Sequence, residues 1–155
     1  MIRTFALIFW GITASQATAQ DDPLENLLAQ WEEDRAIPID GTVLDINALI
    51  WRARPVVIFA DSPNDPAFRQ QMDLLSAHAD DLAERDVIIV VDTDPAAESE
   101  LRTRLRPRGF SLVLIGKDGE VELRKPAPWS VREISRSIDK MPVRQQEVED
   151  RRNDP

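Results

Sequence analysis

From residue 54 onward, the chain alternates between short apolar runs and longer segments with apolar residues at every third or fourth position. The continuous apolar run at 87–91 is typical of a strand that is covered on both faces. Apolar residues at helical spacing between Phe68 and Leu82 indicate an amphipathic helix. The pattern predicts a strand at 56–59, a helix at 65–82, a strand at 87–91, a helix at 94–105, a strand hairpin at 110–115 and 120–124, and a helix at 130–141.

Capping residues support these helices. Asp65 and Asp94 each precede a proline, which combines a favoured N-cap with a residue that suits the first helical turn. Ser130 and Glu133 have the spacing of a capping box, and Pro142 is expected to end the last helix. The order strand, helix, strand, helix, hairpin, helix is that of the thioredoxin core. We therefore predict an α/β, thioredoxin-like three-layer fold with a mixed four-stranded sheet.

The first 19 residues have the features of a secretory signal peptide. Arg3 supplies a positive start, residues 5–12 form an apolar stretch, and Ala17 and Ala19 form a small-x-small cleavage site. The apolar stretch is too short to span a bilayer, although an uncleaved anchor is the alternative. We expect export to the periplasm or secretion after cleavage near Ala19, with no membrane span in the mature chain.

The remaining chain divides into three parts by its pattern. Apolar residues from Leu24 to Trp31 predict a short helix, and the turn after Asp40 suggests a loose or hairpin-like continuation. The end of the chain is dense in charge, and we expect it to be solvated and frayed. The expected organisation is a signal peptide at 1–19, an N-terminal helix and irregular lead-in at 20–53, a thioredoxin-like domain at 54–142 and a charged C-terminal tail at 143–155.

Composition narrows the function. Among 155 residues there are 19 Lys and Arg against 28 Asp and Glu, which gives a net charge of −9. This balance argues against a nucleic-acid partner and favours basic partners or divalent cations. The chain has no cysteine, so a thiol nucleophile, a CxxC redox pair and a disulfide are all excluded.

Three segments carry a resemblance to a known family. They are residues 54–66, the turn Gly-Lys-Asp-Gly at 116–119 with the strand before it, and residues 138–147, which end in Met-Pro-x-Arg-x-x-Glu. These segments resemble a thioredoxin-like family of domains of unknown function. Its members, also called DUDES domains, occur in exported bacterial proteins and in sushi-repeat and equarin-like extracellular matrix proteins. The resemblance implies a thioredoxin-like or peroxiredoxin-like fold and a secreted protein, but no established activity.

The chain departs from true thioredoxins at the positions that carry their chemistry. Pro63 and Pro66 stand where thioredoxins have their two cysteines. Ser111 stands where they have a cis-proline, and we expect a trans bond there because a non-proline cis bond costs about 2.5–4 kcal/mol. Redox catalysis through cysteine is therefore excluded, and we expect no cofactor.

Four aspartates are the candidates for metal binding. Asp61 and Asp65 follow the first predicted parallel strand, and Asp92 and Asp94 follow the second. Since ligands bind at the carboxyl edge of such sheets, the four carboxylates could hold Mg²⁺ or Ca²⁺ in a metal-dependent hydrolase. The alternative is that Asp65 and Asp94 cap helices while the other two are solvated.

A second group of residues is a candidate for partner binding. Arg144 and Glu147 belong to the segment that carries the resemblance, and they either dock a partner or fasten the last helix through ion pairs. Our first interpretation is a non-catalytic module that binds a protein or a cell-envelope component, and the metal-dependent hydrolase is the alternative. The loop candidates at the carboxyl edge are Ser62, Pro63, Asn64 and Ser111.

Overall fold

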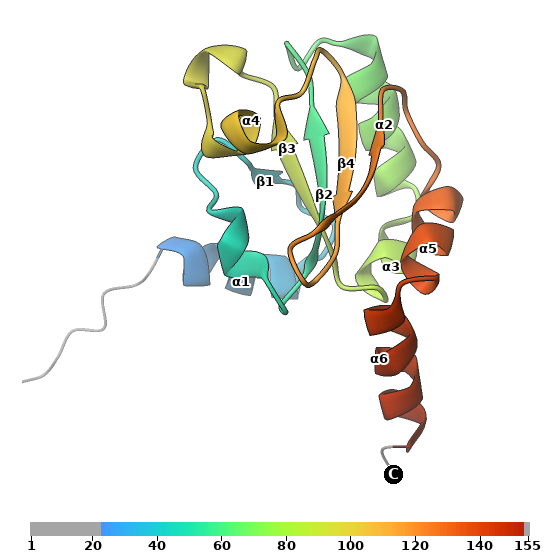
Figure 1. Ribbon diagram of the computed structural model, residues 1–155. Helices are drawn as coiled ribbons and strands as arrows, with labels where there is room; N and C mark the ends of the chain where they lie inside the picture. The colour runs from blue at the N-terminus through green and yellow to red at the C-terminus, as the bar shows by residue number, and fades with distance from the viewer. Residues whose placement is uncertain (1–22, 154–155) are drawn as a thin grey trace, which may run out of the picture.

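The structure is a computed structural model that describes residues 23–153, in which helices lie on both faces of one sheet (Figure 1). The predicted signal peptide lies outside the described residues. The elements, in chain order, are α1 (Pro23–Glu33), β1 (Ile39–Asp40), the 3-10 helix η1 (Ile46–Leu49), β2 (Arg54–Phe59), α2 (Pro66–Ser76), α3 (Ala79–Ala83), β3 (Val87–Asp92), the 3-10 helix η2 (Pro95–Ala97), α4 (Glu100–Leu105), β4 (Ser111–Ile115), β5 (Val121–Lys125), α5 (Val131–Asp139) and α6 (Pro142–Asn153).

The sheet is mixed and has five strands in the order β1-β3-β2-β4-β5. Strands β1 and β2 run parallel to β3, whereas β4 is antiparallel to both β2 and β5. The prediction of four strands was therefore wrong in number. The additional strand is β1, where Ile39 pairs with Val90 and Asp40 with Val91. A strand of two residues has no periodicity of its own, because only its pairing with β3 defines it.

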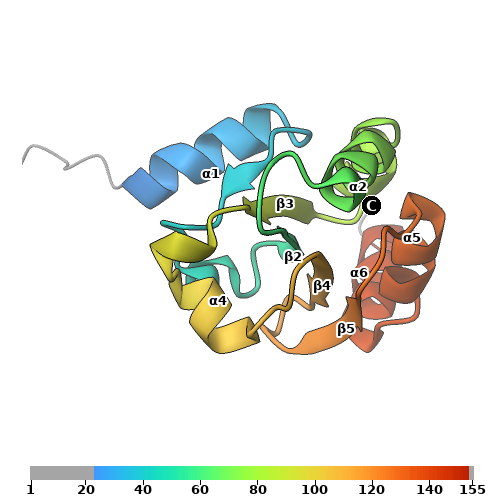
Figure 2. The same cartoon turned by 90° about the horizontal axis from the view of Figure 1, so that it is seen from above.

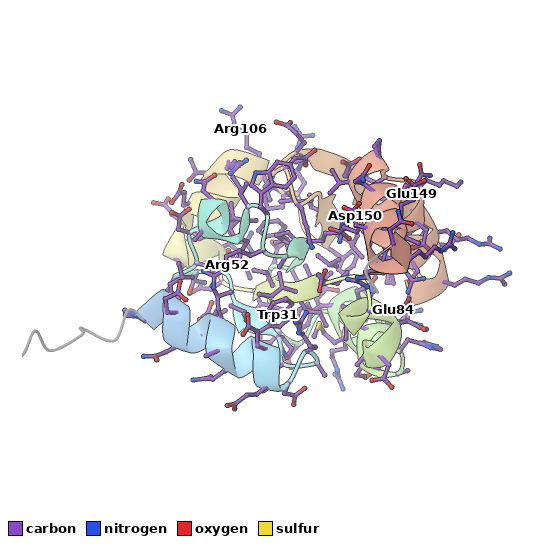
Figure 3. All side chains as sticks on the ribbon, turned by 90° about the horizontal axis from the view of Figure 1, so that it is seen from below. Trp31, Arg52, Glu84, Arg106, Glu149 and Asp150 are labelled. Carbon is purple, nitrogen blue, oxygen red and sulfur yellow. The ribbon has the colours of Figure 1, made fainter. Side chains whose placement is uncertain are left out.

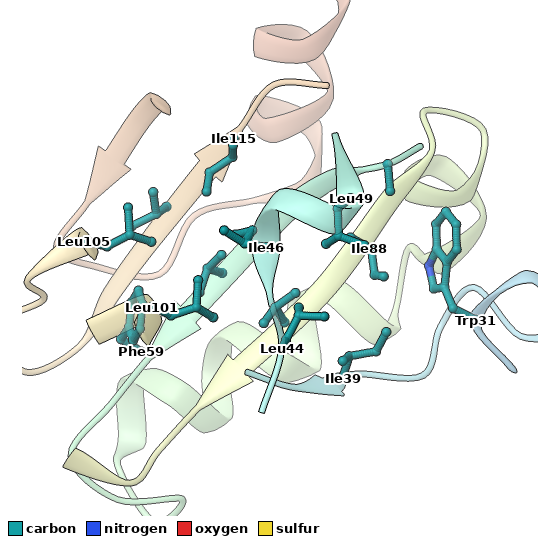
Figure 4. Close-up of a cluster of buried hydrophobic side chains, with 14 of the residues drawn as sticks. Trp31, Ile39, Leu44, Ile46, Leu49, Phe59, Ile88, Leu101, Leu105 and Ile115 are labelled. Atoms are coloured by element: carbon teal, nitrogen blue, oxygen red, sulfur yellow. The ribbon is translucent and has the colours of Figure 1, made fainter. Parts of the chain in front are cut away.

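Two apolar clusters separate the sheet from its helices. Helices α1 and α4 lie on one face, and α2, α3 and α5 lie on the other (Figure 2). Every residue of β2 is buried: Val57 and Phe59 join the first cluster, whereas Val56 and Ile58 join the second. This two-sided burial explains the continuous apolar run in the sequence. The first cluster (Figure 4) includes Trp31, Ile39, Leu44, Ile46, Leu49, Phe59, Ile88, Leu101, Leu105 and Ile115.

Both helices predicted between the first three long strands are interrupted. The helix expected at 65–82 is divided into α2 and α3, because His78 leaves the helical conformation with φ −136° and ψ 37°. The helix expected at 94–105 is divided into η2 and α4. Glu98 there adopts a left-handed conformation, and Ser99 caps α4 by accepting the N–H of Arg102. The predicted caps Asp65 and Asp94 are confirmed.

The charged end of the chain, whose final residues were expected to be solvated and frayed, is helical as far as Asn153. Helix α5 already ends at Asp139, three residues before Pro142, and Pro142 is the first residue of α6, a position that needs no backbone N–H. In Figure 1, α6 continues below α5 and extends past the lower end of the sheet. None of the helices between residues 23 and 153 is long and apolar enough to cross a membrane. All peptide bonds in this part of the chain are trans, including the one expected at Ser111.

Candidate functional site

Asp92, at the carboxyl end of β3, is 1 % exposed, and both oxygens of its carboxylate accept hydrogen bonds. Its carboxylate accepts hydrogen bonds from Oγ of Ser99 at 2.5 Å and from Nε of Arg102 at 2.8 Å. The Arg102 guanidinium also donates to the backbone carbonyl oxygens of Ala60 at 2.6 Å and of Asp92 at 3.0 Å. Asp92 and Arg102 therefore fasten α4 to the carboxyl ends of β2 and β3.

The other three aspartates have separate surroundings. Asp65 accepts the backbone N–H groups of Ala67 at 2.8 Å and Phe68 at 3.2 Å, which caps α2. Asp94 accepts the N–H of Ala96 at 3.0 Å at the start of η2, and Asp61 is exposed. Within residues 23–153, no group of three or more histidine or acidic residues is arranged to hold a metal ion.

The four loop candidates lie at one edge of the sheet. Ser111 pairs with Phe59 at the end of β2, and residues 62–64 follow directly in the loop that leads to α2. Pro63 and Asn64 are exposed, whereas Ser62 and Ser111 are half-buried. Oγ of Ser62 accepts the N–H of Asn64 at 3.1 Å, and the Ser62 carbonyl accepts the N–H of Asp65 at 3.1 Å. The loop thus presents its exposed residues in a defined conformation.

The opposite end of the sheet holds a partly buried ionic network around Glu147. Arg54, at the start of β2, is 0 % exposed and donates to Oε1 of Glu147 at 3.0 Å. Nζ of Lys117, in the β4–β5 turn, lies 2.8 Å from the same oxygen and 2.9 Å from Oδ2 of Asp86. Arg54 also donates to the backbone carbonyl of Arg85 at 2.9 Å. Glu147 therefore joins α6 to two segments that lie far from it in the sequence.

Arg144 completes this network from the same helix. Its side chain is 4 % exposed and lies 3.5 Å from Oε2 of Glu147, 3.6 Å from Oε1 of Glu84 and 3.9 Å from Oδ1 of Asp139. Arg85 holds the Asp139 carboxylate through two hydrogen bonds, of 2.9 and 3.0 Å. Figure 3 looks onto this end of the molecule, where Glu84 lies beside α6. These contacts fit the interpretation that Arg144 and Glu147 fasten the last helix. We define the ionic network as Arg54, Arg85, Asp86, Lys117, Arg144 and Glu147.

The cations of the network stabilise its carboxylates in their charged form. Partial burial raises the pKa of Glu147, but Lys117 and Arg54 outweigh it and hold this pKa below its usual range. Burial likewise raises the pKa of Asp86, and Lys117 and Arg35 together lower it below its usual range. Both carboxylates therefore favour folding in their ionised state.

Acid is expected to destabilise the protein through these two groups. As the pH falls, the two carboxyl groups are protonated first in the unfolded chain, near the ordinary pKa values of Glu and Asp, about 4.3 and 3.9. The folded chain resists protonation, so the stabilisation is lost as the pH falls from these values through the lowered pKa values of the folded state. Urea unfolding between pH 7 and pH 3 should show a steeper loss for the unmodified chain than for Glu147→Gln. Parallel curves for the two proteins would contradict this assignment.

Sequence reasoning identified only part of the network. Arg144 and Glu147 were singled out by the resemblance, whereas Arg54 and Lys117 were not, although both lie in segments that carried it. A charged residue at the start of a continuous apolar run was the available indication for Arg54. The network holds four cations and two carboxylates, and Glu84 and Asp139 supply two further carboxylates at its margin, which is an arrangement that stabilises a fold.

Comparison with known proteins places these features in a family. A family model described as "Domain of unknown function (DUF4174)" matches residues 45–147, which include the whole ionic network and end on Glu147. The chain is also similar to coiled-coil domain-containing protein 80 of Danio rerio, with 31 % identity over 128 residues. That match covers 63 % of this chain and only 15 % of the relative's length.

Proposed function

This chain belongs to the DUF4174 family of domains of unknown function, and we propose that it is an exported, thioredoxin-like module that binds a protein or a cell-envelope component without catalysing a reaction. Parallel strands β2 and β3 beside the antiparallel hairpin β4–β5, with helices on both faces, support the thioredoxin-like assignment. The signal-peptide features of residues 1–19 support export.

The observation that carries the non-catalytic role is that internal partners bind the carboxylates of Asp92 and Glu147. Asp92 is occupied by Ser99 and Arg102. Glu147 is occupied by Arg54 and Lys117. Side chains that are bonded to each other inside the fold are poorly placed to act on a substrate. The exposed loop at the carboxyl edge is better suited to contact a partner, because a rigid scaffold holds it.

The similarity to a much longer protein supports a modular role. The matching region of coiled-coil domain-containing protein 80 is a small part of that protein, of which this chain covers 15 %. A region of this size that matches a small part of a longer relative is typical of a domain that folds around its own core. Binding to other proteins is a function that such a domain can perform.

Export and partner contact can be tested together in a bacterium that encodes the chain. Mass spectrometry of the exported fraction should find a product that begins near Gln20, after cleavage near Ala19. A photo-cross-linking residue at Asn64 should give a discrete adduct. The same residue at Gln146, an exposed position on α6, serves as the matched control and should give none. A chain that stays uncleaved in the cytoplasm would overturn the proposal of export, and the absence of any adduct specific to Asn64 would overturn binding through the loop at the carboxyl edge.

A further inference from the structure

Trp51 combines high exposure with a strained backbone. The residue follows η1, is 65 % exposed and has φ 64°, in the left-handed region. A bulky aromatic residue rarely adopts this conformation. Such strain persists only where the surroundings enforce it, and it is concentrated at functional sites.

Contacts with the β4–β5 turn hold Trp51 in this conformation. Its N–H donates to the carbonyl oxygen of Lys117 at 2.7 Å, and the N–H groups of Arg52 and Ala53 turn back to Leu49 at 2.9 and 3.0 Å. Gly119 lies against Ile50, the residue before Trp51, since a Cβ atom on Gly119 would be 3.2 Å from the Ile50 side chain. The turn therefore holds the backbone of Trp51, and its exposed indole and the turn lie at one corner of the molecule.

The other two described tryptophans each carry a cation on the ring. The Arg35 guanidinium lies 4.0 Å from the ring centroid of Trp31, and Nζ of Lys125 lies 4.4 Å from that of Trp129. Within residues 23–153, no cation lies over the Trp51 ring. Its aromatic face is thus available to a positive group from outside the chain.

Carboxylates flank the same corner. Asp118 and Glu120 belong to the turn that bonds Trp51, and Glu122 follows in β5; all three are exposed. The side chains of Asp118 and Glu122 converge beside Gly116, where a Cβ atom would lie 2.5 Å from Oδ1 of the first and 3.1 Å from Oε1 of the second. None of the three forms an ion pair within the described part of the chain.

The nearby cations bond to groups other than these three carboxylates. Arg104 donates to the side-chain carbonyl of Asn47 at 2.9 Å and to the backbone carbonyl of Gly119 at 3.3 Å. Arg52 is bound by Glu25 through two hydrogen bonds, and Lys117 belongs to the ionic network. Asp118, Glu120 and Glu122 therefore have no ion-pair partner in the described part of the chain, and the Arg104 guanidinium at the same turn bonds neutral oxygens only.

We propose that Trp51, with Asp118, Glu120 and Glu122, docks an arginine- or lysine-containing segment of a partner protein. A basic side chain would stack on the indole, and the carboxylates would bind its neighbouring cations. The net charge of −9 would assist the approach of such a segment. This inference rests on the proposed function only in that the domain acts by binding protein. The two sites are distinct, because Trp51 lies before β2 and the loop at 62–64 lies after it.

The test uses a synthetic peptide with three arginines separated by glycines as its probe. In ¹⁵N-edited NMR spectra of the full chain, the indole N–H signal of Trp51 should shift saturably, while those of Trp31 and Trp129 change little. The affinity should fall at least tenfold in Trp51→Asn and at least threefold in the double variant Asp118→Asn, Glu122→Gln. A peptide with glutamates in place of the arginines should not bind.

Two controls keep the result interpretable. Asparagine tolerates the left-handed conformation, so Trp51→Asn should melt at the same or a higher temperature than the unmodified chain. The double variant Asp73→Asn, Asp80→Asn removes two exposed carboxylates from α2 and α3, on the other face of the sheet, and should leave the affinity unchanged.

Equal affinity of Trp51→Asn and the unmodified chain would overturn the inference, as would an equal loss in the control double variant. If the peptide does not bind at Trp51 but Asn64 gives an adduct, the docking site at Trp51 is ruled out and the proposed function stands. Binding at Trp51 without an Asn64 adduct would support this site and overturn the assignment of the loop at the carboxyl edge.

Discussion

Glu147→Ala is expected to lower the free energy of unfolding by about 3–5 kcal/mol, the range for removing one partner of a buried ion pair. The substitution leaves the guanidinium of Arg54 without its carboxylate while 0 % of that residue is exposed. It also removes a bond to Lys117 at 2.8 Å. Urea unfolding at pH 7, followed by circular dichroism, measures this loss as a lower midpoint with a similar slope.

Glu149→Ala is the matched control for this prediction, because Glu149 is an exposed acid on the same helix. Its effect should stay within about 0.5 kcal/mol. A double variant that replaces both Arg54 and Glu147 with methionine should lose less than the sum of the two single substitutions, since neither charge is left alone. Additive losses would show that the two side chains do not stabilise each other.

The four long strands could be predicted because their apolar patterns are local. Residues 56–59 and 87–91 lie between turn or polar residues and are buried on both faces, so their boundaries in the sequence are within two residues of those in the structure. The helix breaks could not be predicted in this way. The apolar spacing continues through Leu75, Ala79 and Leu82 although the backbone leaves the helix at His78. Periodicity records which side is buried, and it does not record a change in backbone direction.

The ionic network could not be derived from local patterns either. Arg54 and Glu147 are 93 positions apart, and no spacing rule connects residues at that distance. For the same reason, α6 resembled a solvated tail: its buried residue is Arg144, and it has no strong apolar stripe. Contacts with charged side chains from distant parts of the chain hold this helix. The resemblance identified Arg144 and Glu147 as distinctive, and the structure supplies the physical reason.

Asp92→Ala is expected to cost about 3 kcal/mol or more, because Arg102 would lose its carboxylate partner in a largely buried position. The Ser99 hydroxyl would also lose its acceptor, and the attachment of α4 to β2 and β3 would loosen. Thermal and urea unfolding of the full chain measure the effect. Arg102→Ala should produce a similar loss, and combining the two substitutions should add little to either one.

Asp61→Ala is the matched control that separates a structural carboxylate from a metal ligand. Asp61 is exposed, so its removal should change the free energy of unfolding by no more than about 0.5 kcal/mol. Titration of the full chain with Mg²⁺, Ca²⁺, Mn²⁺ and Zn²⁺ should leave its melting temperature unchanged, because Arg102 and Ser99 already occupy Asp92. The hydrolase alternative requires the reverse: saturable metal binding that both Asp61→Ala and Asp92→Ala abolish. If Asp92 is structural, Asp92→Ala lowers stability and changes no metal affinity. If the two residues are metal ligands, both Asp61→Ala and Asp92→Ala lower the metal affinity.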